Sequence, residues 1–192
     1  MTKYGFAINL HRCIGCRTCS ISCKMENNVA DGTMRIRVLN DDEALVYDVP
    51  TGSYPNLAMT WTPVPCQHCD NPPCVEACPT GASTKQDNGL VLIEAEECIG
   101  CESCVKACPY DARSINPDTN IADKCTMCEH RLLNGEQTTL CQLSCPGRAI
   151  VAGDLDDPES GIAKIIAENE TVRLLEESGT GPNVYYWNSV RQ

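Results

Sequence analysis

Cysteine is the residue type that carries the chemistry in this chain. Its 192 residues include 16 cysteines, and such enrichment points to disulfides, bound metals or redox chemistry. The cysteines fall into four groups of four, with none left over: Cys13, Cys16, Cys19 and Cys23; Cys66, Cys69, Cys74 and Cys78; Cys98, Cys101, Cys104 and Cys108; and Cys125, Cys128, Cys141 and Cys145.

The first and third groups have the spacing of bacterial ferredoxins. Both read C-x2-C-x2-C-x3-C, a run in which three thiolates hold one cluster and the fourth reaches a second cluster. Cysteines on a tight loop can direct their sulfurs at one cubane, and Gly15 and Gly100 let backbone amides approach its sulfides. The three-residue step leads into a helical turn that directs the last thiolate elsewhere. The spacing therefore predicts four 4Fe–4S clusters.

Two other uses of cysteine fit the spacing less well. A secreted disulfide scaffold fits the even count, but C-x2-C pairs are poor geometry for a whole disulfide framework. A zinc-stabilised interaction module uses C-x2-C pairs too, yet zinc takes four ligands in two pairs, and a run of three closely spaced cysteines fits that poorly. His11, His68 and His130 are not expected as ligands, because the cysteines already supply four complete sets.

The lengths of chain between the groups predict which thiolates share a cluster. The second and third groups are joined by a short stretch and form one two-cluster unit, so the first and fourth groups, about a hundred residues apart, form another. The last cysteine of each group crosses to the partner cluster. The predicted ligand sets are site 1 (Cys13, Cys16, Cys19 and Cys145), site 2 (Cys66, Cys69, Cys74 and Cys108), site 3 (Cys98, Cys101, Cys104 and Cys78) and site 4 (Cys125, Cys128, Cys141 and Cys23).

These pairings predict an α+β fold made of two pseudo-symmetric units that resemble bacterial ferredoxin, one inserted in the other, each with two 4Fe–4S clusters. The outer unit is split over residues 1–30 and 119–152, and the inner unit covers residues 62–118. Residues 31–61 form an inserted β region, and residues 153–192 form a C-terminal extension for partner docking.

Short patterns outside the cysteine groups predict the local elements. Residues 34–39 alternate like a strand, with which residues 43–47 could pair. A turn at residues 87–89 is expected to join two strands just before the third group.

The C-terminal extension is expected to begin with a helix. Asp157 would cap this helix with Pro158 at its first position, and a later run of isoleucines supplies an apolar face. The aromatic residues 185–187 are then either a docking strip for a partner or packed against the chain's own ferredoxin unit.

The overall charge excludes one class of partner. The chain has 15 basic and 26 acidic residues, for a net charge of −11, which argues against binding nucleic acid. Bound clusters would add further negative charge, so nearby cations should offset it. Lys24, Arg12, Arg17 and Lys124 stand beside predicted ligands, where they either do this or are solvated at the surface.

Together, the cysteine groups resemble a known family, the four-cluster iron–sulfur subunits of the DMSO reductase family of molybdopterin oxidoreductases. The stretched fourth group and the short length resemble its polysulfide and thiosulfate reductase branch. Residues that carry the resemblance are Cys23–Asn27, Tyr54–Asn56, Cys66–Cys74, Cys78–Ala82, Cys108–Arg113 and Gly153–Pro158.

The resemblance implies an electron-transfer subunit without an active site of its own. It implies a catalytic partner that holds a molybdopterin cofactor with molybdenum or tungsten, and often a membrane anchor that exchanges electrons with quinone. Site 1 resembles the cluster next to that catalytic subunit. The alternatives are a soluble polyferredoxin, or a subunit linked to formate dehydrogenase or hydrogenase.

This chain is expected to belong to a membrane-associated complex without itself inserting into the membrane. No apolar run approaches the roughly 18 residues that span a bilayer, and no signal peptide is visible. Cytoplasmic residence is the simplest interpretation of the sequence alone. The resemblance favours the periplasmic face instead, reached by co-export with the catalytic partner.

Overall fold

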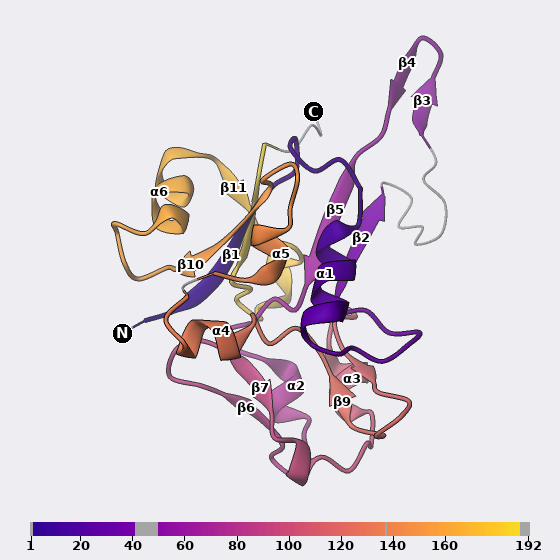
Figure 1. The fold of residues 1–192 in the computed structure, drawn as a ribbon, viewed down its shortest axis with the longest axis vertical. Helices are drawn as coiled ribbons and strands as arrows, with labels where there is room; N and C mark the ends of the chain where they lie inside the picture. Colours follow the sequence, from indigo (N-terminus) through magenta and orange to yellow (C-terminus); the bar gives the residue numbers. More distant parts are fainter. Residues whose placement is uncertain (1, 41–49, 137, 189–192) are drawn as a thin grey trace.

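The computed structural model describes residues 2–40, 50–136 and 138–188. Its largest sheet has the strand order β10-β1-β12-β11 (Figure 1). The central strand β1 (Tyr4–Asn9) pairs antiparallel with β10 (Ile150–Asp154) and parallel with β12 (Val184–Trp187), which also pairs with β11 (Thr171–Val172). Five of the six residues of β1 are buried, as a central strand covered on both faces requires.

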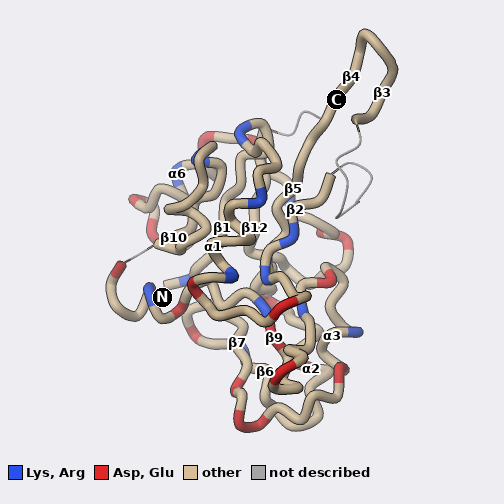
Figure 2. Tube along the Cα trace, turned by 45° about the vertical axis from the view of Figure 1, so that its right-hand side comes forward, with Lys and Arg blue, Asp and Glu red and all other residues tan. Residues whose placement is uncertain are grey.

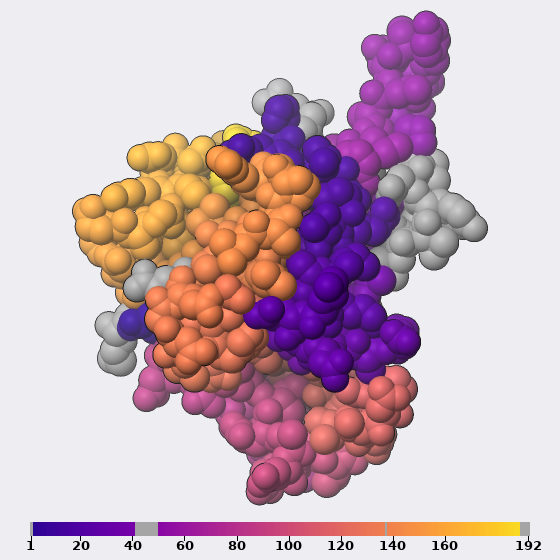
Figure 3. Space-filling view, viewed as in Figure 1, coloured from indigo at the N-terminus to yellow at the C-terminus, as the bar shows by residue number. Residues whose placement is uncertain are grey.

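Short helices follow the cysteine loops and come together in pairs. In the half of the molecule next to the large sheet, α1 (Thr18–Glu26) packs against α5 (Leu140–Leu143), and an ion pair between Arg131 and Glu26 joins α4 (Glu129–Leu133) to α1. In the other half, α2 (Pro73–Glu76) packs against α3 (Ser103–Ala107). Figure 3 shows the N-terminal segment directly beside the segment that contains the fourth cysteine group. The fold thus brings the first and fourth groups together, and likewise the second and third.

Two hairpins flank the pair α2 and α3. The first joins β6 (Ser83–Lys85) to β7 (Val91–Ile93), and the second joins β8 (Ser114–Ile115) to β9 (Ala122–Asp123). The turn predicted at residues 87–89 is confirmed: Gly89 takes a φ of 82° there, a left-handed conformation that glycine adopts without strain. A short 3-10 helix, η1 (Ala95–Glu97), then leads into the third cysteine group.

The predicted strand near residue 36 is confirmed as β2 (Ile36–Asn40), but its ladder partner is β5 (Trp61–Pro65). The segment 43–47, which the sequence pattern indicates as partner, lies outside the described residues. Between them β3 (Thr51–Ser53) and β4 (Asn56–Ala58) form a hairpin that projects from the body of the molecule (Figure 1).

The C-terminal helix α6 (Gly161–Glu168) is present, but its predicted cap is wrong. Ser160 is the N-cap: its hydroxyl accepts a hydrogen bond from the Ala163 N–H at 3.1 Å. The Asp157 carboxylate accepts instead from the Glu159 N–H at 2.9 Å, so it stabilises the preceding turn and is not available to the helix. Ile162 is fully buried against the large sheet, which confirms the apolar face.

The aromatic residues near the C-terminus pack on the chain's own sheet. They form β12 beside β1, and both Tyr186 and Trp187 are buried. Tyr186 also donates a hydrogen bond from its hydroxyl to the Pro63 carbonyl at 2.9 Å. Of the two alternatives for this strip, the structure therefore shows packing within the chain. A short 3-10 helix, η2 (Glu176–Ser178), precedes it.

The hydrophobic core contains cysteine thiols beside ordinary apolar side chains. Its largest cluster combines Phe6, Ile8, Leu90 and Tyr186 with buried cysteines from three of the four groups. Among the residues that the structure describes, no helix combines the length and the apolar character needed to cross a bilayer.

Candidate iron–sulfur centres

Three of the predicted ligand sets each surround a cavity of their own. The thiols of site 1 line one cavity, those of site 2 a second, and those of site 3 a third. The three cavities are alike in size, as expected for sites that accommodate the same group. In each, the cysteine that crosses over (Cys145, Cys108 or Cys78) lies with three cysteines from another group.

The fourth set comes together inside the molecule. All four thiols of site 4 are buried. Burial raises the pKa of the Cys23 thiol, and the neighbouring charges of Cys125 and Cys128 raise it further. The pKa of Cys141 is also raised by burial and by Cys125, Cys128 and Cys23. Thiols that influence one another in this way lie close together, so the crossing cysteine Cys23 belongs spatially with the fourth group.

The cysteine loops curve sharply because several residues take left-handed backbone conformations. Gly15 and Gly100 both have φ of 67°. A Cβ atom on Gly15 would collide with the Trp61 ring, and one on Gly100 would collide with the Asn120 carbonyl oxygen. Glycine is therefore required at these positions by close packing as well as by φ.

Backbone and side-chain donors approach several of the thiols. The N–H groups of Ala122, Met127 and Ala149 donate to the sulfurs of Cys98, Cys125 and Cys145 at 3.4, 3.3 and 3.3 Å. The Asn27 amide nitrogen donates to the Cys23 sulfur at 3.6 Å. Four thiols around one cavity with N–H groups directed at sulfur form the donor set of a 4Fe–4S cluster.

Comparisons with known proteins agree with this donor set. A family model described as a 4Fe-4S dicluster domain matches residues 57–155, and one described as a 4Fe-4S binding domain matches residues 10–26. A tetrathionate reductase subunit of Salmonella typhimurium is 41% identical, over 96% of this chain and 72% of that protein.

Two further relatives match nearly the whole chain. The arsenate respiratory reductase iron–sulfur subunit of a Shewanella species is 34% identical, over 97% of both chains. A Halobacterium salinarum protein described as a dimethyl sulfoxide reductase iron–sulfur subunit is 43% identical, over 98% of this chain and 80% of that protein.

The chain belongs to this family of iron–sulfur reductase subunits. The resemblance to the DMSO reductase family drawn from the motifs is thereby confirmed, and a tetrathionate reductase protein among the relatives agrees with the branch expected. The protein is an electron-transfer subunit that carries 4Fe–4S clusters and is not itself the catalytic subunit. A zinc-stabilised interaction module does not fit this family.

Burial makes several thiols of the iron–sulfur subunit harder to ionise. Burial raises the pKa of Cys69 and of Cys125 to about 12, and that of Cys19 to about 11. Cys78 differs, because hydrogen bonds from Ser83, Thr80 and Ala82 outweigh its slight burial and lower its pKa to about 7. Since iron binds thiolates, loading the clusters releases protons and contributes to folding.

The basic residues predicted to offset cluster charge take different positions. Arg12 and Arg17 line the site 1 cavity, and Lys124 is buried. Lys24 instead points to the loop after α1: its ammonium donates to the Ala30 carbonyl at 2.5 Å and lies 3.5 Å from the Asp31 carboxylate.

Two further cations were not expected from the sequence. Arg113 lines the site 2 cavity and is buried. Arg35 lies near Cys23 and Cys125 and forms a two-pronged ion pair with Asp123. Neither residue stands beside a cysteine in the sequence, so only the folded chain brings these charges to the sites.

His68 is a structural residue of the iron–sulfur subunit. Its side chain is fully buried, and Nδ1 accepts a hydrogen bond from the Val91 N–H at 3.0 Å. Burial and the positive charges of Lys124, Lys85 and Arg113 lower its pKa well below the usual range, so the ring is neutral. His130 lies on the surface and pairs with Glu26 at 2.9 Å.

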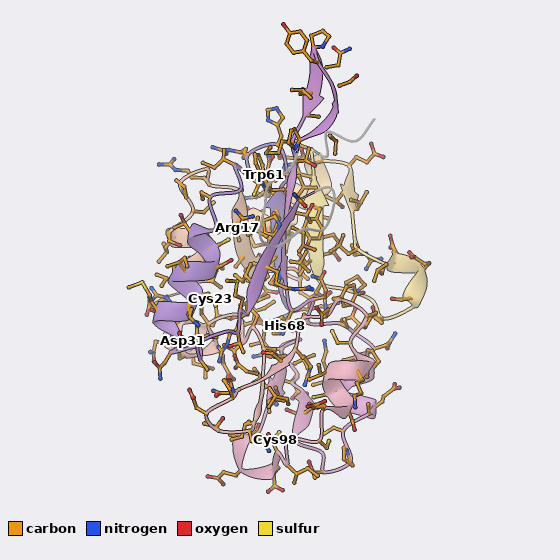
Figure 4. All side chains as sticks on the ribbon, turned by 90° about the vertical axis from the view of Figure 1, so that its right-hand side faces the viewer. Arg17, Cys23, Asp31, Trp61, His68 and Cys98 are labelled. Carbon is orange, nitrogen blue, oxygen red and sulfur yellow. The ribbon has the colours of Figure 1, made fainter. Side chains whose placement is uncertain are left out.

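The four sites lie in a row in the order 1, 4, 2, 3. Helix α1 carries Cys19 of site 1 and Cys23 of site 4. The Cys66 thiol of site 2 is close enough to Cys125 of site 4 to raise its pKa, and the contact between α2 and α3 joins site 2 to site 3. Figure 4 shows this progression from Arg17 through Cys23 and His68 to Cys98.

The two ends of this row reach the surface. Cys16 of site 1 and Cys101 of site 3 are both exposed, whereas the cysteines of site 4 are all buried. The equivalent residues Ile14 and Ile99, which follow the first cysteine of each loop, are 59% and 62% exposed. A row of sites with a buried middle and two exposed ends can admit an electron at one end and release it at the other.

Proposed function

We propose that this subunit carries electrons between a molybdopterin-containing catalytic subunit and a second redox partner, such as a membrane anchor that reacts with quinone. The observation that supports this most strongly is the row of four thiol sites with two exposed ends. A bound 4Fe–4S cluster accepts and returns one electron. The names of the dimethyl sulfoxide, tetrathionate and arsenate reductase relatives support a catalytic partner of this type.

The four cysteines of each site serve as the ligands of one cluster in this proposal. The shared cavities of sites 1, 2 and 3, and the mutual effects of the site 4 thiols on their pKa values, support these sets. The corresponding domain plan has an outer ferredoxin unit in residues 1–30 and 119–152, with an inner unit in residues 62–118 inserted in it. The pairing of β1 with β10 supports this plan.

The site 1 end is the end that we assign to the catalytic subunit. Trp61 packs against Gly15 in the site 1 loop, and it directly follows the projecting hairpin of β3 and β4. Two apolar side chains of the hairpin face solvent: Tyr54 is 89% exposed and Leu57 is 55% exposed. An isolated two-stranded hairpin is at best marginally stable in water, so a partner that covers this one would stabilise it.

The site 3 end is the end that we assign to the second partner. Ile99 is surrounded in the sequence by the exposed residues Glu96, Glu97 and Glu102. Figure 2 shows acidic residues distributed around this end of the molecule, near α2, α3 and β6. The partner is therefore expected to present Lys or Arg side chains around an apolar contact, because complementary charge steers association.

Co-purification tests this arrangement. Tyr54→Ser combined with Leu57→Ser should release the catalytic subunit while leaving the iron content and the second partner unchanged. Ile99→Glu should do the reverse. A chain that loads its clusters but captures no molybdopterin protein from its native host would favour a soluble polyferredoxin and contradict the proposal.

The location that we propose is the periplasmic face of the membrane, reached by co-export with the catalytic partner. The folded subunit would cross with its clusters in place, bound to a partner that carries a twin-arginine signal. Deleting the partner's signal should hold both proteins in the cytoplasm, which fractionation would show. If this chain stays in the cytoplasm while the partner's signal is intact, co-export is excluded.

A further inference from the structure

Two positive charges are buried in the middle of the row of sites. Arg113 is 4% exposed and Lys124 is 2% exposed. Burying a charge costs much free energy unless it is paired. Within the described ranges, no carboxylate lies within 4.0 Å of either side chain to form a salt bridge. The compensating negative charge must come from another source.

Arg113 has hydrogen-bond donors that no protein atom satisfies. Its Nη1 donates to the Ser83 hydroxyl at 2.8 Å, but Nε and Nη2 are buried without an acceptor. The same side chain lines the site 2 cavity together with Cys66 and Cys74. A buried guanidinium with unsatisfied N–H groups at a cavity lined by thiols is matched by an acceptor within that cavity. Thiolate and sulfide sulfurs of a cluster are such acceptors.

The electrostatic surroundings of Arg113 agree with this geometry. Burial alone would lower its pKa, yet the pKa is raised by the charges of Cys74 and Cys66, both of site 2, and by the charge of Cys104 of site 3 and a hydrogen bond to that residue. Arg113 therefore lies where the two clusters of the inner unit approach each other.

Lys124 occupies the corresponding position on the other side of site 2. Its ammonium donates to the Cys125 carbonyl at 2.8 Å and to the Val91 carbonyl. Burial lowers its pKa, while the thiolates of Cys66 in site 2 and Cys125 in site 4 raise it. Site 2 is thus flanked by one buried cation toward site 3 and a second toward site 4. The nearby His68 is neutral and adds no charge.

Site 2 needs these charges more than an exposed site would. Each electron that arrives increases the negative charge of the site, and burial away from water makes that increase unfavourable. Site 2, with three of its four thiols buried, would therefore have a lower reduction potential than the more exposed site 3 and would hinder transfer between them. Hydrogen bonds to sulfur and nearby positive charge act in the opposite direction.

We propose that Arg113 and Lys124 are positioning residues that raise the reduction potential of the site 2 cluster, with Arg113 donating hydrogen bonds from Nε and Nη2 to its sulfurs. One electron passes from a neighbouring reduced site to site 2, so one site is oxidised as the other is reduced, and no proton is transferred. This inference rests on the proposed ligand sets. It adds the residues that keep the reduction potential of site 2 close to the potentials of its neighbours.

Redox titration of the native complex, monitored by electron paramagnetic resonance, tests the role of charge. Arg113→Gln should make reduction of one cluster at least tenfold less favourable, a fall of about 59 mV for a one-electron couple, with the other clusters much less affected. Arg113→Lys keeps the charge and should restore part of that shift. Lys124→Met should lower the potential of the same cluster.

Lys106→Gln is the matched control. Lys106 stands between Cys104 and Cys108 in the sequence, closer to ligands than Arg113, but its side chain is 77% exposed and lies near Glu102. Water screens such a charge, so the four midpoint potentials should remain those of the wild type. A shift in Lys106→Gln as large as that in Arg113→Gln would overturn the assignment, because burial would then not matter.

A second measurement detects the proposed hydrogen bonds directly. In the complex with ¹⁵N-labelled arginine, pulsed paramagnetic resonance of the reduced protein should detect hyperfine coupling to an arginine nitrogen. On the signal whose potential Arg113→Gln shifts, that coupling should vanish in Arg113→Lys. If the labelled wild type shows none, or Arg113→Gln retains full iron with unchanged potentials, the inference is wrong. Missing clusters in the wild type would instead contradict the proposed function.

Discussion

The hydroxyl oxygens of Ser22 and Ser144 lie 2.7 Å apart and share a hydrogen bond between α1 and the residue that caps the C-terminus of α5. Ser22 stands between Cys19 of site 1 and Cys23 of site 4, and Ser144 stands directly before Cys145 of site 1. The bond therefore joins the two segments at the point where each passes from one site to the next. This contact adds to the packing of α1 against α5, which brings residues that are remote in the sequence together.

The first prediction concerns this contact. A half-buried hydrogen bond contributes about 1 kcal/mol, which is about a fivefold change in rate. Ser22→Ala and Ser144→Ala should each speed the anaerobic loss of visible absorbance in guanidinium chloride. The double variant should lose absorbance no faster than the faster of the two single variants, because both substitutions remove the same hydrogen bond. Strictly additive effects would mean that the two hydroxyls act independently.

The second prediction concerns ligand crossing. Cys145→Ser should alter the same paramagnetic signal as Cys16→Ser, because both residues line the site 1 cavity. The signals of sites 2 and 3 should remain, since their cavities share no cysteine with site 1. The idea would fail if Cys145→Ser altered the signal that Cys125→Ser alters while Cys16→Ser altered a different one.

The four cysteine groups and the turn at residues 87–89 could be recognised in the sequence because both depend on local spacing. Ligands two or three residues apart must share a loop, and Gly89 directly indicates the turn at residues 87–89. The partner of β2 was not predictable, because β5 contains Pro63 and Pro65, which local rules exclude from the middle of a sheet. A two-stranded sheet has only edges, so it accommodates both prolines.

Arg113 could not be found from the sequence for a different reason. It and Lys106 are both basic residues near Cys108, and nothing in their spacing separates a buried cation from an exposed one. The difference arises when Ser83 of β6 accepts a hydrogen bond from Arg113. Long-range packing decides whether such a side chain is buried, whereas the spacing of the cysteines within a group can be read directly from the sequence.

The third prediction concerns the ion pair of Arg35 and Asp123. The guanidinium donates from Nη2 to Oδ1 at 2.6 Å and from Nε to both carboxylate oxygens at 3.0 and 3.1 Å. Both side chains are largely buried, at 14% and 18% exposure. Asp123→Asn should destabilise the protein by about 1 to 3 kcal/mol, seen as faster loss of absorbance in denaturant.

Lys164→Gln is the control for that ion pair. It removes a pair of similar length with Glu159, 2.9 Å, whose side chains are 51% and 83% exposed. Exposed pairs contribute little, so the rate should stay close to that of the wild type. Equal effects of the two variants would show that burial does not strengthen the Arg35–Asp123 contact.

The last prediction concerns Gly15. An alanine there would adopt a left-handed conformation, which costs about 1 to 2 kcal/mol, and its Cβ would also collide with the Trp61 ring. Gly81→Ala has a similar φ of 76° but no atom within 4 Å of the added Cβ, so it isolates the backbone cost. Gly15→Ala should therefore lose its clusters faster than Gly81→Ala. Adding Trp61→Ala should recover part of the difference, because it removes the clash. If both glycine variants lose iron at one rate, the packing of Trp61 does not constrain the site 1 loop.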